Sequence, residues 1–83
     1  MQGRMTEFGW PGARQRLVAI LAEGQLRIGT RDGSRLSPAA RALAEQVEGR
    51  YVSVASAERA LRGSGVHEAD SVLWREAPPG LLA

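Results

Sequence analysis

Two alanine-rich segments with a short break between them constrain the fold of this 83-residue chain more than any other feature. The first, residues 38–48, follows Ser37 and opens with Pro38, a pairing that is typical of a helix N-terminus. The second, residues 53–62, is rich in helix formers and ends at a Gly-Ser-Gly stretch, which stops a helix. The sequence therefore predicts two short consecutive helices joined by a turn.

The start of the second segment also has the character of a strand. Residues 50–56 alternate, and Val52 and Val54 are β-branched, which favours extended structure. However, Val54, Ala57 and Leu61 are spaced to bury one stripe of a helix. We therefore predict a turn through Val52 and a helix after it.

The residues before this pair are expected to form a third helix and a strand. Leu17, Ile20 and Leu21 recur at helical spacing, and Gly24 follows them as a natural left-handed cap. The expected segments, in chain order, are a flexible arm over residues 1–9, a helix over 12–23, a strand over 25–30, the two helices above, a hairpin wing within 66–77 and a tail over 78–83. One domain, residues 10–77, would then be α+β and mainly helical, with three helices and a small β-hairpin wing.

This order of elements is that of a winged helix-turn-helix, which places the second helix of the motif in the DNA major groove. The polar side of that helix carries four candidate side chains: Ser53, Ser56, Arg59 and Arg62. Arg27, Arg31 and Arg35, in the strand and loop before the motif, have two interpretations. They either form an ordinary solvated edge, which is the preferred interpretation for each one singly, or contact phosphates beside the motif.

The charge and composition add weaker constraints. The net charge is +2, and all eleven basic residues are arginine, which suits bidentate contact with guanine and phosphate. A GC-rich genome explains the same bias. The chain has no cysteine, which excludes disulfides, thiol catalysis and cysteine-based zinc sites and fits a reducing, cytoplasmic location. No apolar run is long enough to span a bilayer, so we expect no membrane partner.

Four stretches resemble the GntR-type winged helix domain: GQLRIG at 24–29, GSRLSP at 33–38, RALAEQ at 41–46 and VSVASAERAL at 52–61. The resemblance covers roughly residues 17–65. The chain departs from the family pattern in reading Ser-Pro for Pro-Ser and in carrying extra residues at 48–51. The resemblance implies that Ser53, Ser56, Arg59 and Arg62 face base edges, with Arg59 foremost. It also implies that Arg50 and Tyr51 contact phosphates.

The expected function is therefore that of a bacterial DNA-binding domain or small transcriptional regulator, acting on double-stranded DNA as a dimer or in tandem. Similar winged helices end bacterial DNA translocases, where they read orienting repeats, so such a role is an alternative. A second alternative is a protein–protein interaction module without DNA binding. The weak net charge, Glu58 in the reading helix and an acidic wing favour it, with Trp74, Leu81 and Leu82 as its contact surface.

Catalysis and metal binding are not expected. His67 lies beside Glu68 and Asp70, but adjacent residues in a turn rarely converge on one ion, and a structural site needs about four ligands. The serines have no base partner apart from His67, and the glycines match no phosphate-binding fingerprint. The sequence therefore predicts a protein that is not an enzyme and has no cofactor.

Overall fold

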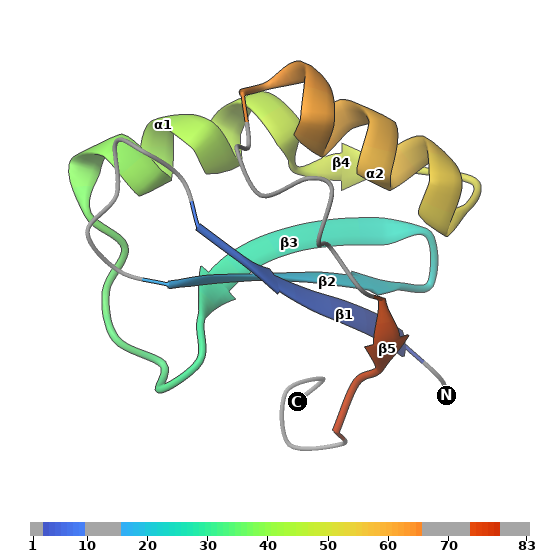
Figure 1. Ribbon diagram of the computed structural model, residues 1–83, viewed down its shortest axis with the longest axis horizontal. Helices are drawn as coiled ribbons and strands as arrows, with labels where there is room; N and C mark the ends of the chain where they lie inside the picture. Colours follow the sequence, from blue (N-terminus) through green and yellow to red (C-terminus); the bar gives the residue numbers. More distant parts are fainter. Residues whose placement is uncertain (1–2, 10–15, 66–73, 79–83) are drawn as a thin grey trace.

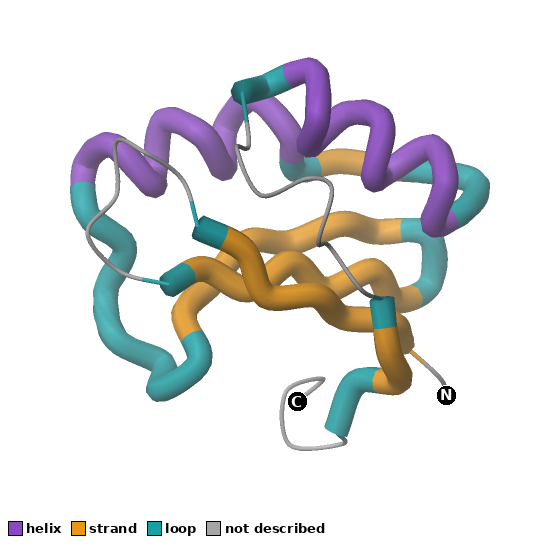
Figure 2. Tube along the Cα trace, in the orientation of Figure 1, coloured by secondary structure: helices purple, strands orange, loops and turns teal. Residues whose placement is uncertain are grey.

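The computed structural model describes residues 3–9, 16–65 and 74–78, and within these ranges two helices lie on one face of a five-stranded antiparallel sheet (Figure 1). The strand order is β4-β3-β2-β1-β5. The elements are β1 (Gly3–Phe8), β2 (Leu17–Ala22), β3 (Gln25–Thr30), α1 (Pro38–Val47), β4 (Gly49–Arg50), α2 (Val54–Gly63) and β5 (Arg75–Glu76). Figure 2 shows the result as two layers, with both helices above β1, β2 and β3.

The expected winged helix-turn-helix with three helices is wrong. The segment expected to be a helix over 12–23 contains β2, because its apolar residues are buried on both sides of a sheet. Leu17, Ala19 and Leu21 belong to the core beneath the helices, whereas Val18 is buried in a second cluster. A strand covered on both faces reads as a continuous apolar run, and such a run does not distinguish strand from helix by its period.

A tight hairpin connects β2 to β3. Ala22 pairs with Gln25, so the loop has two residues, Glu23 and Gly24, with φ of 54° and 74°. Positive φ at both positions is the mark of a type I′ turn, whose twist matches that of the flanking strands. Gly24 therefore has the left-handed conformation expected of it, but it lies in a hairpin and not at the end of a helix.

Most of the segment expected to be a flexible arm, residues 3–8, is a strand paired with its neighbour. β1 pairs with β2 along its whole length, from Gly3 opposite Ala22 to Phe8 opposite Leu17. Phe8 is completely buried in the core between sheet and helices. β1 is thus held in the sheet by residues of other elements, which the composition of residues 1–9 alone does not reveal.

The strand over 25–30 and the two expected helices are confirmed. Ser37 caps α1 by accepting a hydrogen bond from the Ala40 N–H at 3.2 Å. One face of α1 is buried at Ala40, Leu43, Ala44 and Val47. α2 buries Ala57 and Leu61 against the same core, so both helices lie on one face of the sheet.

The expected wing falls mostly outside the described residues. Of 66–77, the structure describes residues 74–77, where β5 pairs antiparallel with β1 at Arg4 and Met5. This strand extends the main sheet and is not half of a separate hairpin with a described partner. Among the described residues, no helix is both long and apolar enough to cross a bilayer.

Candidate nucleic-acid interface

The face of the sheet turned away from α1 and α2, here called the rear face, collects arginine side chains. Leu26 and Ile28 of β3 point into the core beneath the helices, so Arg27 between them points to the rear face. Arg50 of β4 lies directly opposite Gln25 of β3, and opposed residues share a face. Arg27 and Arg50 are therefore diagonal neighbours on the rear face, and both are exposed.

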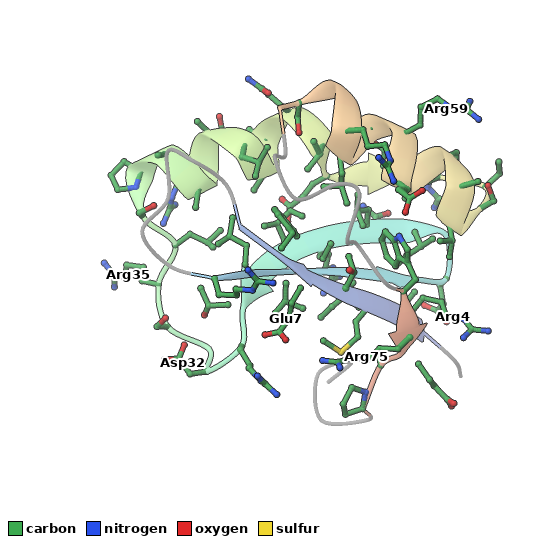
Figure 3. All side chains as sticks on the ribbon, in the orientation of Figure 1. Arg4, Glu7, Asp32, Arg35, Arg59 and Arg75 are labelled. Carbon is green, nitrogen blue, oxygen red and sulfur yellow. The ribbon has the colours of Figure 1, made fainter. Side chains whose placement is uncertain are left out.

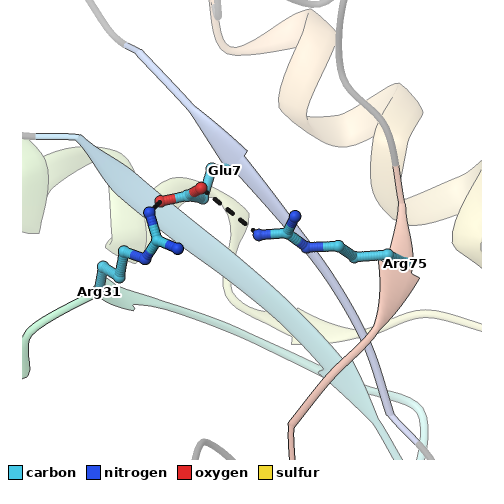
Figure 4. Close-up of polar contacts among 3 residues, drawn as sticks. All are labelled: Glu7, Arg31 and Arg75. Carbon is cyan, nitrogen blue, oxygen red and sulfur yellow. Dashed lines mark hydrogen bonds and ion pairs between the residues drawn. The ribbon is translucent and has the colours of Figure 1, made fainter.

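Two further arginines reach the rear face around one glutamate. Glu7 of β1 bridges Arg31, at 3.6 Å, and Arg75 of β5, at 3.5 Å (Figure 4). The Glu7 side chain is 19% exposed, against 73% for Arg31 and 59% for Arg75. The single carboxylate thus neutralises part of the charge at this end of the face, while both guanidinium groups stay in contact with solvent.

A second acid lies close to the same end. Asp32, in the turn after β3, accepts a hydrogen bond from the Ser34 N–H at 3.0 Å. The Ser34 hydroxyl, its backbone N–H and the Thr30 hydroxyl hold the pKa of Asp32 below its ordinary value. Asp32 also lines a hollow of about 300 Å³ together with Arg16, Arg31, Thr30 and Ser34. Acids and bases are therefore mixed at this end of the sheet.

The other end of the rear face has a different balance. Arg27 and Arg50 form no ion pair with a described residue. The nearby Glu48 uses Oε2 to accept a hydrogen bond from the Ile28 N–H, at 2.8 Å. The β3–β4 end therefore presents two exposed guanidinium groups that form no ion pair with a described residue.

Between the two ends lies a small apolar cluster. Met5, Val18 and Ala77 are buried there, with Ile20 packed against them. Arg27 lies opposite Ile20, and Ile20 lies opposite Met5. The rear face therefore has a buried apolar centre, and the exposed arginines surround this centre.

The serines expected to face base edges have their polar groups engaged at the start of α2. The Ser53 hydroxyl accepts from the Ser56 N–H, and the Ser56 hydroxyl accepts from the Ser53 N–H, each at 3.1 Å. This reciprocal pair is a capping box, which satisfies backbone donors at a helix N-terminus. The two serines therefore have a structural role, since they cap the N-terminus of α2.

Tyr51 also has a structural contact. Its hydroxyl donates to the carbonyl oxygen of Val47 at 2.7 Å, and its ring packs against the core. Its backbone N–H donates to Gly24 at 2.8 Å, which ties the loop before α2 to the β2–β3 hairpin. The Tyr51 side chain therefore joins the end of α1 to the sheet.

The expected arginines do not share one surface. Arg59 points outward from α2, whereas Arg35 lies at the opposite end of the molecule (Figure 3). Arg62 forms an ion pair with Glu58 at 3.7 Å on α2. Arg50 belongs to the rear face and Arg35 to a hollow of about 460 Å³ beside α1, lined also by Arg41 and Glu45. The expected set is thus divided among three surfaces.

The sequence alone did not predict the contribution of Arg75 to the rear face, or that Arg27 and Arg50 are diagonal neighbours there. Alternation along 25–31 could have placed Arg27 and Arg31 on one face. No local signal predicts β4, because it has only two residues. Within the described ranges no group of metal-ligating side chains gathers, and His67, Glu68 and Asp70 lie outside those ranges.

Comparison with known proteins adds no family assignment, since no protein-family model, curated protein or solved structure matches the chain. Any function must therefore be inferred from the residues of the site alone.

Proposed function

We propose that this protein binds duplex DNA by contacting the phosphate backbone with arginines of the rear face. The observation that carries the proposal is the position of Arg27 and Arg50, exposed diagonal neighbours with no ion-pair partner among the described residues. Arg31 and Arg75 extend the same face. Arginine side chains that approach phosphates in this way supply most of the sequence-independent affinity for DNA.

Duplex DNA is favoured over a single strand by the location of the aromatic rings. Proteins that bind single strands stack the bases on exposed aromatic side chains. Among the described residues, the aromatic side chains are Phe8, Tyr51 and Trp74, and all three belong to or pack against the core beneath the helices. The described part of the rear face therefore offers charge and no stacking platform.

DNA binding is compatible with the expected cytoplasmic regulator, for which the absence of cysteine is one argument. The surface that contacts DNA in this proposal differs from the one that the sequence predicted. A helix-turn-helix would use Arg59 on the outer side of α2, which lies in the other layer of the molecule. The two layers can be separated by experiment, because each carries two exposed arginines without a described ion-pair partner: Arg27 and Arg50 on the sheet, Arg41 on α1 and Arg59 on α2.

The test is fluorescence anisotropy of a labelled duplex at low and rising salt, with two matched double variants. The R27Q/R50Q variant should weaken binding at least about tenfold, or about 1.4 kcal/mol. The R41Q/R59Q variant loses the same formal charge and should bind within a factor of about two of the parent, because a distant charge is screened. Equal losses in the two variants would assign binding to net charge, not to a site.

Two other outcomes would redirect the proposal. Loss of binding only in R41Q/R59Q would return the DNA contact to the helix layer, and the single variants R41Q and R59Q would then separate α1 from the outer side of α2. No binding of the unsubstituted chain at low salt would remove DNA as the partner and favour the protein–protein interaction role. Circular dichroism of each variant would confirm that the fold is intact.

A further inference from the structure

We propose that Arg27 and Arg50, with Gln25 between them, form a clamp for a single phosphate group. The inference rests on the proposed function for the origin of that phosphate, a phosphodiester of duplex DNA. It goes further in assigning both arginines to the same phosphate. The clamp is defined here as these three side chains of β3 and β4.

The register of the two strands places the three side chains together. Gln25 lies directly opposite Arg50, and Arg27 is two residues along β3 on the same face. Diagonal neighbours across an antiparallel pair have Cβ atoms about 7–8 Å apart, within the reach of long side chains. The two guanidinium groups can therefore converge on one tetrahedral anion above Gln25.

The two positive charges of Arg27 and Arg50 would be stabilised by a bound anion. Like charges on neighbouring strand positions repel each other. Arg31 and Arg75 avoid this cost by sharing Glu7, whereas Arg27 and Arg50 form no ion pair with a described carboxylate, and the nearby Glu48 is hydrogen-bonded to the Ile28 N–H instead. A bound phosphate would supply at the β3–β4 end the negative charge that Glu7 supplies at the other end.

The donors also match the ligand. Each guanidinium presents a planar fork that can hold two oxygens of a phosphate. The half-buried Gln25 side chain makes no hydrogen bond to a described residue, so its amide can donate a further hydrogen bond to one of the same oxygens. Glu23 and Glu48 are the nearest acids along the chain, two residues from Gln25 and from Arg50, and one Glu48 carboxylate oxygen is engaged with the Ile28 N–H.

The first test uses inorganic phosphate and the intact chain. In a titration followed by NMR, the Nε–H signals of Arg27 and Arg50 should shift together with one apparent Kd, and Arg59 should not move. The R27Q substitution should abolish most of the Arg50 shift. Independent shifts, or no shift at either arginine, would overturn the clamp.

The second test uses the salt dependence of duplex binding. Binding affinity falls with salt by about 0.9 logarithmic units of slope for each phosphate neutralised on B-DNA. If both arginines hold one phosphate, R27Q/R50Q should lower the slope by about 0.9, and the two single substitutions should be non-additive. A decrease of about 1.8 with additive effects would mean two separate phosphates and would refute the clamp.

The two tests distinguish failure of the clamp from failure of the proposed function. Concerted shifts with inorganic phosphate, without any binding to the duplex, would retain the clamp and remove DNA as its source of phosphate. Duplex binding through Arg27 and Arg50 with additive losses would retain DNA binding and remove the shared phosphate. The variants R27K and R50K, which keep the charge without the fork, should restore the salt slope but only part of the affinity.

Discussion

The carboxylate of Glu48 accepts a hydrogen bond from the backbone N–H of Ile28, with 2.8 Å between Oε2 and N. This contact continues the hydrogen bonding of β3 beyond the end of β4, which pairs only with Gln25 and Leu26. An unpaired strand edge is a template for association with another chain, and a charged side chain on the edge opposes this. The Glu48 side chain therefore supplies a hydrogen-bond partner for β3 at a position that the two-residue β4 does not reach.

Replacing Glu48 tests that contact directly. We expect Glu48→Ala to lower the free energy of unfolding by about 1.5 kcal/mol, the lower end of the range for a hydrogen bond to a charged group, because Glu48 is exposed. Glu48→Gln keeps an acceptor oxygen and should lose less. Urea denaturation gives the stability, and hydrogen exchange at the Ile28 amide gives the local effect. Glu45→Ala, an exposed change on α1, is the control, and an equal loss there would contradict the assignment.

The capping box makes a prediction about the role of Ser53. Because its hydroxyl accepts from the Ser56 N–H, Ser53→Ala should destabilise the chain by about 1 kcal/mol, whereas glycine at this position costs only about a few tenths. Thermal denaturation of Ser53→Ala and Ser53→Gly measures the difference. If Ser53→Gly folds well but binds duplex DNA much more weakly, Ser53 has a contact role beyond capping.

The β2–β3 hairpin depends on the conformation of Gly24. At φ of 74° an added Cβ is strained, and we expect Gly24→Ala to cost about 1–2 kcal/mol. The cost is conformational, because the nearest atom to that Cβ, the Tyr51 carbonyl oxygen, lies at an ordinary 3.5 Å. Gly29→Ala is the matched control, since its Cβ would meet nothing within 4 Å and its φ is not positive. Equal denaturation midpoints for the two variants would contradict the turn assignment.

Glu7 links stability to the charge of the rear face. We expect Glu7→Gln to lower the free energy of unfolding by no more than about 1 kcal/mol, because Arg31 and Arg75 are mostly exposed and solvent screens both ion pairs. The same change frees two guanidinium groups, so affinity for duplex DNA should rise and its salt dependence should steepen. Weaker binding in a correctly folded Glu7→Gln variant would show instead that Glu7 orients the arginines.

Asp32 predicts a pH dependence of stability. Hydrogen bonds from Ser34 and Thr30 hold the pKa of Asp32 below its ordinary 3.8, so folding favours the ionised carboxylate. The stabilisation is fully present above the unfolded pKa and is lost as the pH falls through the lower folded pKa. A carboxyl NMR titration should show the depressed pKa directly. Asp32→Ala should reduce the loss of stability on acidification, and an unchanged acid limb would contradict the prediction.

The helices could be predicted from the sequence because their signals are local. Ser37 with Pro38 begins α1, and Ser53 caps α2, each through contacts within three residues along the chain. β2 could not be assigned in the same way, because Leu17 to Ala22 is apolar on both faces and has no single period. Its identity as a strand depends on the partner strands that cover its two edges.

The candidate site was less predictable than the helices for a related reason. Arg27 and Arg50 are 23 residues apart in sequence and become neighbours only because the two-residue β4 pairs with the start of β3. The role of Arg75 depends on β1, a segment whose polar composition indicated a flexible arm. The sequence identifies individual arginines as candidates. It does not show which of them share a face, because that depends on how the strands pair.

The pairing of β5 with β1 also determines when the sheet can be completed. Arg75 and Glu76 close the outer edge of β1 opposite Met5 and Arg4, across some seventy residues of chain. Contacts of such long sequence separation form late, because the intervening loop entropy must be lost first. On a ribosome, a nascent chain stalled before β5 emerges should therefore hold the β2–β3 hairpin with the outer edge of β1 still unpaired.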